Sequence, residues 1–141
     1  QGIGELSDAA SALDYLQSMN TNAKQCWVAG FSFGAWIGMQ LLMRRPEISG
    51  FISVSPPANM YDFSFLAPCP ASGLIINGLA DRVAPPEDTV ILVNKLHEQK
   101  GITITHEEVE GSGHFFEDPH MDPMINSVQT YVKRRMTENT R

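Results

Sequence analysis

The sequence predicts an α/β protein in which helices cover both faces of a mostly parallel β-sheet, a three-layer α/β/α arrangement. Two patterns and one motif support this class. Segments with apolar residues at helical spacing alternate with short apolar runs along the 141 residues. The first of these runs is apolar on both sides, as strands covered by two layers of helices are. The pentapeptide 30–34, Gly-Phe-Ser-Phe-Gly, joins that run directly to a helical segment. Alternating strands and helices form parallel sheets with right-handed crossovers.

Each element is placed by its apolar period and by the residues that begin or end it. The expected helices lie at 7–19, 33–45, 85–101 and 123–136, and the expected strands at 26–29, 51–55, 73–77 and 102–106. Ser7 or Asp8 is expected to cap the first helix, and Asp88 the third. The basic run 133–135 is expected near the end of the last helix, where cations complement the helix dipole.

Composition excludes several classes of function. The formal net charge of −6 argues against a nucleic-acid partner. No apolar run reaches the length needed to cross a bilayer, so no membrane partner is expected. Cys26 and Cys69 have neither metal-ligand spacing nor the number that a disulfide framework requires, which indicates reduced thiols and a cytoplasmic location. We expect no metal and no organic cofactor.

The pentapeptide 30–34 reads Gly-x-Ser-x-Gly. Between a strand and a helix, this pattern predicts a tight turn that exposes the hydroxyl of Ser32 and points the first N–H groups of the helix toward whatever the serine attacks. The glycines allow the strand and the helix to approach closely. The alternative interpretation is a glycine-rich turn with a surface serine, so the motif needs partner residues.

Suitable partners follow two later strands. Asp81 lies in the loop after the third expected strand, and His114 lies in the loop after the fourth. Functional groups gather beyond the carboxyl ends of parallel strands. A histidine can take the serine proton and return it to a leaving group, and a carboxylate can hold the imidazole in the correct tautomer. The N–H of Phe33 is the expected oxyanion donor.

Other histidines and acids are weaker candidates. His97 is expected within a helix and His106 within a strand, while His120 lies in a less constrained loop. Asp62, in the loop after the second expected strand, is the main alternative to Asp81. Glu117 and Asp118 are expected to be solvated charges flanking the histidine loop.

With these motifs the chain resembles the α/β-hydrolase superfamily over nearly its whole length. Gly-Phe-Ser-Phe-Gly resembles the nucleophile elbow, the segment 76–85 resembles the acid loop, and Gly113-His114-Phe115-Phe116 resembles the histidine loop. The N-terminal segment also resembles small bacterial hydrolases related to dienelactone-hydrolase-like esterases. The resemblance implies a catalytic triad of Ser32, Asp81 and His114.

The resemblance also implies that residues 1–141 form a single hydrolase domain that is N-terminally incomplete. The early strands and the loop that supplies the second oxyanion donor are expected to be absent. The strand at 27–29 would then be an unpaired edge, covered by an N-terminal segment or by a second chain in a homo-oligomer.

These expectations define a serine hydrolase acting on a small-molecule carboxylic ester or thioester. The alternatives are a non-catalytic hydrolase-like binding or assembly module and an acyltransferase that uses the same triad. The loop 56–72 is short for a lid. Its apolar residues are expected either to form a rim for an acyl or aromatic group or simply to pack the loop down; they are Tyr61, Phe63, Phe65 and Leu66.

Overall fold

The computed structural model describes residues 2–139 of the chain. Within this range, helices and strands alternate as the sequence predicts. The elements are α1 (Ile3–Met19), β1 (Trp27–Phe31), α2 (Phe33–Arg44), β2 (Gly50–Val54), β3 (Gly73–Gly78), α3 (Pro86–His97), β4 (Ile104–Val109) and α4 (Met121–Asn139). The loop over residues 55–72 contains no helix or strand, in agreement with the expected absence of a helical lid.

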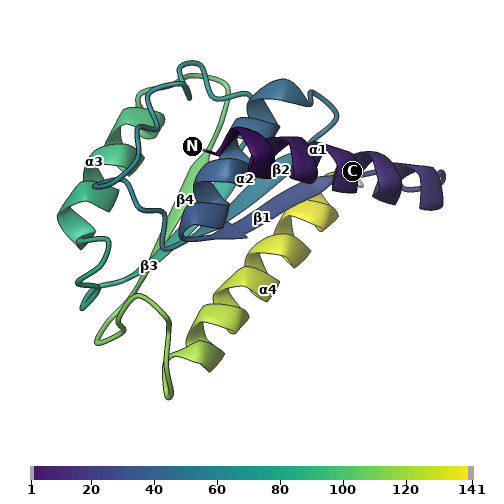
Figure 1. The fold of residues 1–141 in the computed structure, drawn as a ribbon. Coiled ribbons are helices and arrows are strands. Elements are labelled where there is room, and N and C mark those ends of the chain that lie inside the picture. Colours follow the sequence, from purple (N-terminus) through teal and green to yellow (C-terminus); the bar gives the residue numbers. More distant parts are fainter. Residues whose placement is uncertain (1, 140–141) are drawn as a thin grey trace.

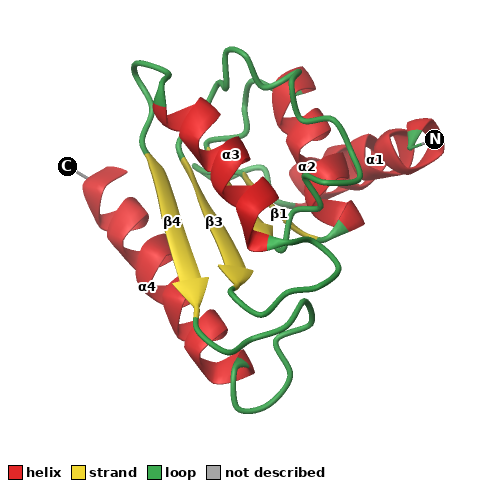
Figure 2. Ribbon diagram, turned by 90° about the vertical axis from the view of Figure 1, so that its left-hand side faces the viewer, coloured by secondary structure: helices red, strands yellow, loops and turns green. Residues whose placement is uncertain are grey.

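The strands form one parallel sheet in the order β1-β2-β3-β4. Helices α1, α2 and α3 lie on one face of this sheet and α4 lies on the other, as Figures 1 and 2 show. The three-layer α/β/α class predicted from the sequence is therefore confirmed. All four strands are parallel, so their carboxyl ends meet at one edge of the sheet. Figure 2 shows β3 and β4 pointing the same way.

The core is divided by the sheet into two apolar clusters. On the face of α1–α3, Phe51 and Ile75 pack against buried leucines of the helices. On the opposite face, Ile52 and Leu74 pack against Tyr131 of α4. Neighbouring residues of β2 and β3 thus face opposite layers, as the pleat of a strand requires. Every residue of β3 is buried, which makes it a firm support for the loops at its carboxyl end.

The first helix begins earlier than expected. Ser7 and Asp8 are not caps, because α1 starts at Ile3 and both residues lie inside it. Gly2 precedes the helix in a left-handed conformation (φ 91°), and its carbonyl accepts a hydrogen bond from the N–H of Leu6. A glycine adopts this conformation without steric cost, which gives the helix a start that needs no side-chain cap.

Asp88 is also not a helix cap. The N-cap position of α3 is Pro85, no side chain caps this helix, and Asp88 lies in its first turn. The predicted strand at 102–106 is displaced as well, because β4 covers 104–109. Gly101 has a φ of 88°, and the N–H of Thr103 bonds to the hydroxyl of Ser72, so pairing starts only at Ile104.

The last helix is longer than predicted at both ends. It starts at Met121 and reaches Asn139, so the basic run 133–135 does not lie in the final turn. Arg135 instead donates hydrogen bonds to the carbonyl oxygens of Ser49 and Ser72, which precede β2 and β3. This basic run therefore anchors α4 to the amino ends of the strands rather than complementing a helix terminus.

Candidate active site

Ser32 lies between the end of β1 and the start of α2. Its backbone has φ 55° and ψ −121°, a conformation that residues other than glycine rarely adopt. Its N–H donates to the carbonyl of Val54 at 2.8 Å, which fixes the turn to β2. A Cβ at Gly30 would overlap the backbone of Gly34, so the close approach of strand and helix requires glycine at this position. The sequence motif thus forms the predicted strained turn.

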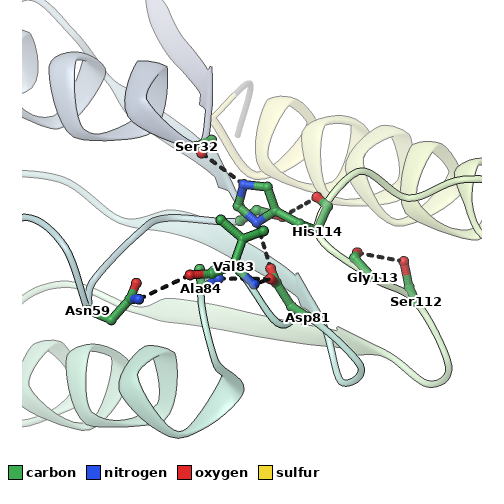
Figure 3. Close-up of polar contacts among 9 residues, drawn as sticks. Ser32, Asn59, Asp81, Val83, Ala84, Ser112, Gly113 and His114 are labelled. Carbon is green, nitrogen blue, oxygen red and sulfur yellow. Dashed lines mark hydrogen bonds and ion pairs between the residues drawn. The ribbon is translucent and has the colours of Figure 1, made fainter.

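Asp81 lies in the loop after β3 and is buried. Its Oδ1 accepts hydrogen bonds from the N–H groups of Val83 and Ala84, both at 2.8 Å. The side chain of Asn59 donates to the carbonyl of Val83 at 3.0 Å, which links this loop to the one after β2 (Figure 3). These contacts leave Oδ2 directed at the histidine loop.

His114 lies in the loop after β4 and connects the other two residues. Its Nδ1 lies 2.7 Å from Oδ2 of Asp81, and its Nε2 lies 2.8 Å from Oγ of Ser32 (Figure 3). The imidazole tautomer with its proton on Nδ1 donates to Oδ2 of Asp81 and leaves Nε2 to accept from the serine hydroxyl. The imidazole is 5% exposed, so little water competes for either contact. The three residues predicted from the sequence are therefore brought together in one hydrogen-bonded chain.

The acid and histidine loops support each other through their backbones. The N–H of Ala80 donates to the carbonyl of Ser112 at 2.9 Å, and that of Leu79 donates to Val109 at 3.0 Å. A Cβ at Gly78 would overlap the carbonyl of Ser112, so glycine is required for the two loops to meet. The acid loop is thus held by main-chain contacts against Val109 and Ser112, which precede His114 in the chain.

The alternative acid and the other histidines lie in different surroundings. Asp62 is exposed, and its Oδ1 accepts from the N–H of Ser64; that hydrogen bond holds the pKa of the Asp62 carboxyl below its usual value. His97 bonds to the carbonyl of Ile104, and His106 bonds to Asn77. His120 lies at the start of α4, where its carbonyl accepts from Met124. Glu117 and Asp118 are exposed, as expected for solvated charges.

The N–H of Phe33 is the first of α2 and has no acceptor within the helix. It directly follows Ser32 in the chain, which is the place from which a backbone donor faces an oxyanion formed at the serine. Helix α2 also directs the positive end of its dipole at this point. The N–H of Phe33 therefore stays the candidate oxyanion donor, with no acceptor inside its own helix.

Aromatic side chains flank the serine. Phe31 packs against His114 and Phe115, with ring centroids 5.3 and 5.7 Å away. Phe33 packs against Tyr61 at 5.4 Å, and Tyr61 in turn stacks on Trp36. Of the four loop residues that were expected either to form a rim or to pack down, Tyr61 lies beside the elbow. Phe63 and Leu66 are buried in the core, and Phe65 packs against it.

An open groove of about 880 Å³ lies between the loop after β2 and helix α3. Tyr61 and Leu66 line one side, and Ile91 and Leu96 line the other. None of Ser32, Asp81 and His114 lines it. The hydrogen-bonded constellation therefore lies outside this groove, and Tyr61 is the residue that the groove shares with the aromatic surroundings of the elbow.

Sequence reasoning did not identify Ser55, which contacts the main chain of His114 and not its imidazole. Its hydroxyl donates to the carbonyl of His114 at 2.9 Å. A partial signal for it exists in the sequence, because Ser55 is the last residue of the second expected strand, 51–55, and so lies next to the loops that carry Asp81 and His114. The polar-residue rule that selects those two extends to Ser55.

A parallel sheet whose carboxyl edge carries a serine elbow, an aspartate and a histidine in that chain order defines the α/β-hydrolase class. Comparisons with known proteins agree. The chain is 61% identical to an Agrobacterium tumefaciens protein of unknown function proposed to be an α/β hydrolase, whose crystal structure matches with a TM-score of 0.94 over 98% of this chain and 63% of that one. A Xanthomonas campestris α/β serine hydrolase without a lid is 28% identical, with a TM-score of 0.82 over 94% of this chain and 57% of that one.

An uncharacterised protein of Rickettsia prowazekii is 51% identical over 119 residues, which are 82% of this chain and 50% of that protein. No family model matches the chain. The chain belongs to the α/β-hydrolase superfamily, as its motifs predict. It spans half to about three-fifths of the length of the relatives that it matches. None of the helices within residues 2–139 combines the length and apolar character of a membrane span.

Proposed function

We propose that this chain carries the catalytic triad of a serine hydrolase that cleaves carboxylic esters. The observation that carries the proposal is the continuous hydrogen-bonded chain from Ser32 through His114 to Asp81, with contacts of 2.8 and 2.7 Å. A serine hydroxyl is a weak nucleophile unless a base takes its proton during attack. The neutral Nε2 of His114 lies in position to do so.

In the proposed reaction, Oγ of Ser32 attacks the ester carbonyl carbon while its proton moves to Nε2 of His114. Asp81 keeps the imidazole oriented and stabilises the imidazolium that forms. The carbonyl oxygen becomes an oxyanion, to which the N–H of Phe33 donates. Collapse of the tetrahedral intermediate breaks the bond to the alcohol, which takes the proton from Nε2. Water then attacks the acyl-enzyme by the same route and releases the acid.

The surroundings of the serine favour an ester with an apolar group. Phe31 is 42% exposed and Phe115 is 58% exposed beside His114, so apolar surface borders the reacting atoms. Exposed apolar patches of this kind mark contact sites for ligands or partners. The loop over 55–72 contains no helix that would cover them, which resembles the lidless Xanthomonas relative. A thioester would use the same steps with a thiol as the leaving group.

A hydrolase-like binding or assembly module is the second candidate. The observation that favours it is the exposed aromatic surface beside His114, because exposed apolar surface also marks contact sites for partner proteins. We propose that residues outside this chain supply a second oxyanion donor. Each donor is worth roughly 3–4 kcal/mol of transition-state stabilisation. Weak turnover is therefore expected of the isolated 141-residue chain.

A fluorophosphonate probe separates the two candidates, because it reacts with an activated serine and needs no substrate. We expect the chain to be labelled and the Ser32→Ala variant to show only background labelling. Ser11→Ala is the matched control, because Ser11 is exposed on α1, far along the chain from the elbow. A folded wild-type chain that never labels would refute hydrolysis by this chain and favour the binding module.

A further inference from the structure

Ser55 has an unusual backbone for a serine. It follows the last residue of β2, has a φ of 50° and is fully buried, with 0% of its surface exposed. Glycine adopts this left-handed region freely, whereas a side chain makes it strained. The side chain therefore carries a steric cost that the surrounding contacts must offset. Its complete burial excludes a role for the hydroxyl as an accessible nucleophile.

The contacts of Ser55 join two other loops of the site. Its N–H donates to the carbonyl of Ile76 in β3 at 2.8 Å, which fixes Ser55 to the centre of the sheet. Its hydroxyl donates to the carbonyl of His114 at 2.9 Å, across 59 positions of sequence. Within residues 2–139, no other hydrogen bond to that carbonyl is found. The backbone of His114 is therefore tied to the most buried strand through a single hydroxyl.

The histidine loop needs such a tie because its own backbone is permissive. Gly111 and Gly113 precede the histidine, and Gly111 has a φ of 80°. Phe116, two residues after it, also has a positive φ of 50°. A loop of this kind has several accessible backbone conformations. The imidazole must nevertheless stay within hydrogen-bond reach of both Ser32 and Asp81.

We propose that Ser55 is a positioning residue, which holds the main chain of His114 so that Nε2 stays on Ser32 and Nδ1 stays on Asp81. This inference rests on the proposed function and adds a fourth residue to it, one that does not touch the substrate. Without the hydroxyl, the buried carbonyl of His114 loses its donor, and an unpaired buried carbonyl is unfavourable. The loop then shifts to find another partner and takes the imidazole with it. A misplacement of about 1 Å can cost roughly 100-fold in rate.

Two substitutions separate the hydroxyl from the backbone strain. Ser55→Gly removes the hydroxyl and fits a φ of 50° without strain, whereas Ser55→Ala removes the hydroxyl and keeps the strain. If the hydroxyl positions His114, both variants lose activity. If Ser55 matters only through its backbone, Ser55→Gly stays active. Ser53→Ala is the control, because Ser53 is also buried and lies two residues earlier on β2.

The experiment measures the fluorophosphonate labelling rate, the hydrolysis of p-nitrophenyl acetate and the proton NMR signal of Nδ1–H in His114. We expect Ser55→Gly and Ser55→Ala to lower the labelling rate and kcat by roughly 10- to 100-fold, the range that a sub-ångström to 1 Å displacement produces. KM should change less than about twofold, because a displaced base weakens the chemical step and not binding. The downfield Nδ1–H signal, which reports the bond to Asp81, should shift or broaden in both variants and stay unchanged in Ser53→Ala.

The proposal is overturned if folded Ser55→Gly keeps the wild-type labelling rate and the wild-type Nδ1–H signal. Failure of the proposed function has a different signature. In that case the wild-type chain itself does not label, and the NMR signal alone decides the role of Ser55. Circular dichroism checks that each variant is folded, and Ser55→Gly decides the question if Ser55→Ala does not fold.

Discussion

His114 depends on residues of three different loops, none of which is near it in sequence. Its two ring nitrogens contact Ser32 and Asp81, and its backbone carbonyl contacts Ser55. Two of these four residues, Ser32 and Ser55, have a positive φ. Such backbone conformations persist only where the surrounding structure compensates for them. The site therefore depends on the carboxyl edge of the sheet, because only loops that are fixed there can hold two residues in strained backbone conformations.

A second histidine, His106, predicts how stability depends on pH. Its Nε2 lies 2.6 Å from Oδ1 of Asn77, a buried side chain, and burial lowers the pKa of the His106 imidazole below its usual value of 6.5. The unfolded chain therefore binds this proton more readily than the folded chain. The free energy of unfolding should therefore be highest, as far as His106 determines it, above pH 6.5, and should fall as the pH drops below 6.5. Titration of the free energy of unfolding by urea between pH 5 and 8 measures this.

The charges that face His106 include Glu107, Glu108 and His97. His106→Gln keeps a hydrogen-bonding side chain and removes the titration. Its stability should vary less with pH between 5 and 7 than that of the wild type. His120→Gln is the control, because His120 lies in the loop before α4 and not on β4. An identical pH profile for His106→Gln and the wild type would contradict the assignment.

At this scale the sequence predicts the three residues of the hydrogen-bonded chain and misses Ser55. Ser32, Asp81 and His114 are found because each is a chemically required type in the loop after a strand, within motifs of fixed spacing. Ser55 carries no motif, and its value comes from a contact 59 positions away that only the folded chain creates. The same limit applies to Tyr61, for which the sequence leaves open whether it packs the loop or borders the site. In the folded chain Tyr61 does both, because it packs against the core and also lies against Phe33.

At the scale of elements, Arg135 of helix α4 contacts the amino ends of three strands. Arg135 donates to the carbonyls of Ser49 and Ser72 at 3.0 and 3.1 Å and to the hydroxyl of Tyr131 at 2.6 Å. Its guanidinium also lies 4.6 Å from the ring centroid of Trp27, the first residue of β1. A planar fork with five donors makes these contacts at once, which an ammonium does not. Helix α4, which lies on the opposite face of the sheet from α1–α3, is thus joined to β1, β2 and β3.

Arg135→Lys should therefore destabilise the chain although it preserves the charge. Hydrogen bonds from charged groups are each worth about 1.5–3 kcal/mol, and a lysine retains some of them, so we expect a loss of about 1–3 kcal/mol in the free energy of unfolding. Urea denaturation monitored by circular dichroism measures it. Arg134→Lys is the matched control, since Arg134 is exposed and makes a 3.2 Å contact with Thr105. Equal stabilities of the two variants would contradict the role of Arg135.

The order and type of all elements follow from the sequence, but several of their ends do not. The period of the apolar residues locates α1, yet its start depends on Gly2 packing under Trp36, a tertiary contact. The start of β4 depends on the register with β3, which pairs Gly73 with Ile104. Periodicity is a local signal, whereas these ends are set by neighbours distant in sequence. The same reason explains why 133–135 looks like a helix end and is in fact an anchor.

At the scale of the whole molecule, β1 is an edge strand of the sheet and none of its residues is buried. Within the described residues it pairs only with β2, although it carries the elbow and is apolar like a central strand. Its free edge presents unpaired N–H and C=O groups, which are a template for pairing with another strand. We propose that this edge is covered in the working protein, by residues outside this chain or by a second copy of it. The matched relatives are longer than this chain, in accord with the first of these.

The isolated chain should therefore self-associate through β1 as its concentration rises, and a charge on that strand should oppose this. Ala29 is exposed in the middle of β1, so Ala29→Lys places a cation on the strand without disturbing the core. Lysine on an edge strand hinders strand pairing, and like charges meet when two copies pair. We expect the dissociation constant to rise roughly tenfold, which corresponds to about 1.4 kcal/mol. Sedimentation velocity over a range of concentrations measures it.

Gln129→Lys adds the same charge on the exposed side of α4 and should leave association unchanged. A wild-type chain that remains monomeric at high concentration, or an Ala29→Lys variant that associates as the wild type does, would show that the edge of β1 is not used for pairing.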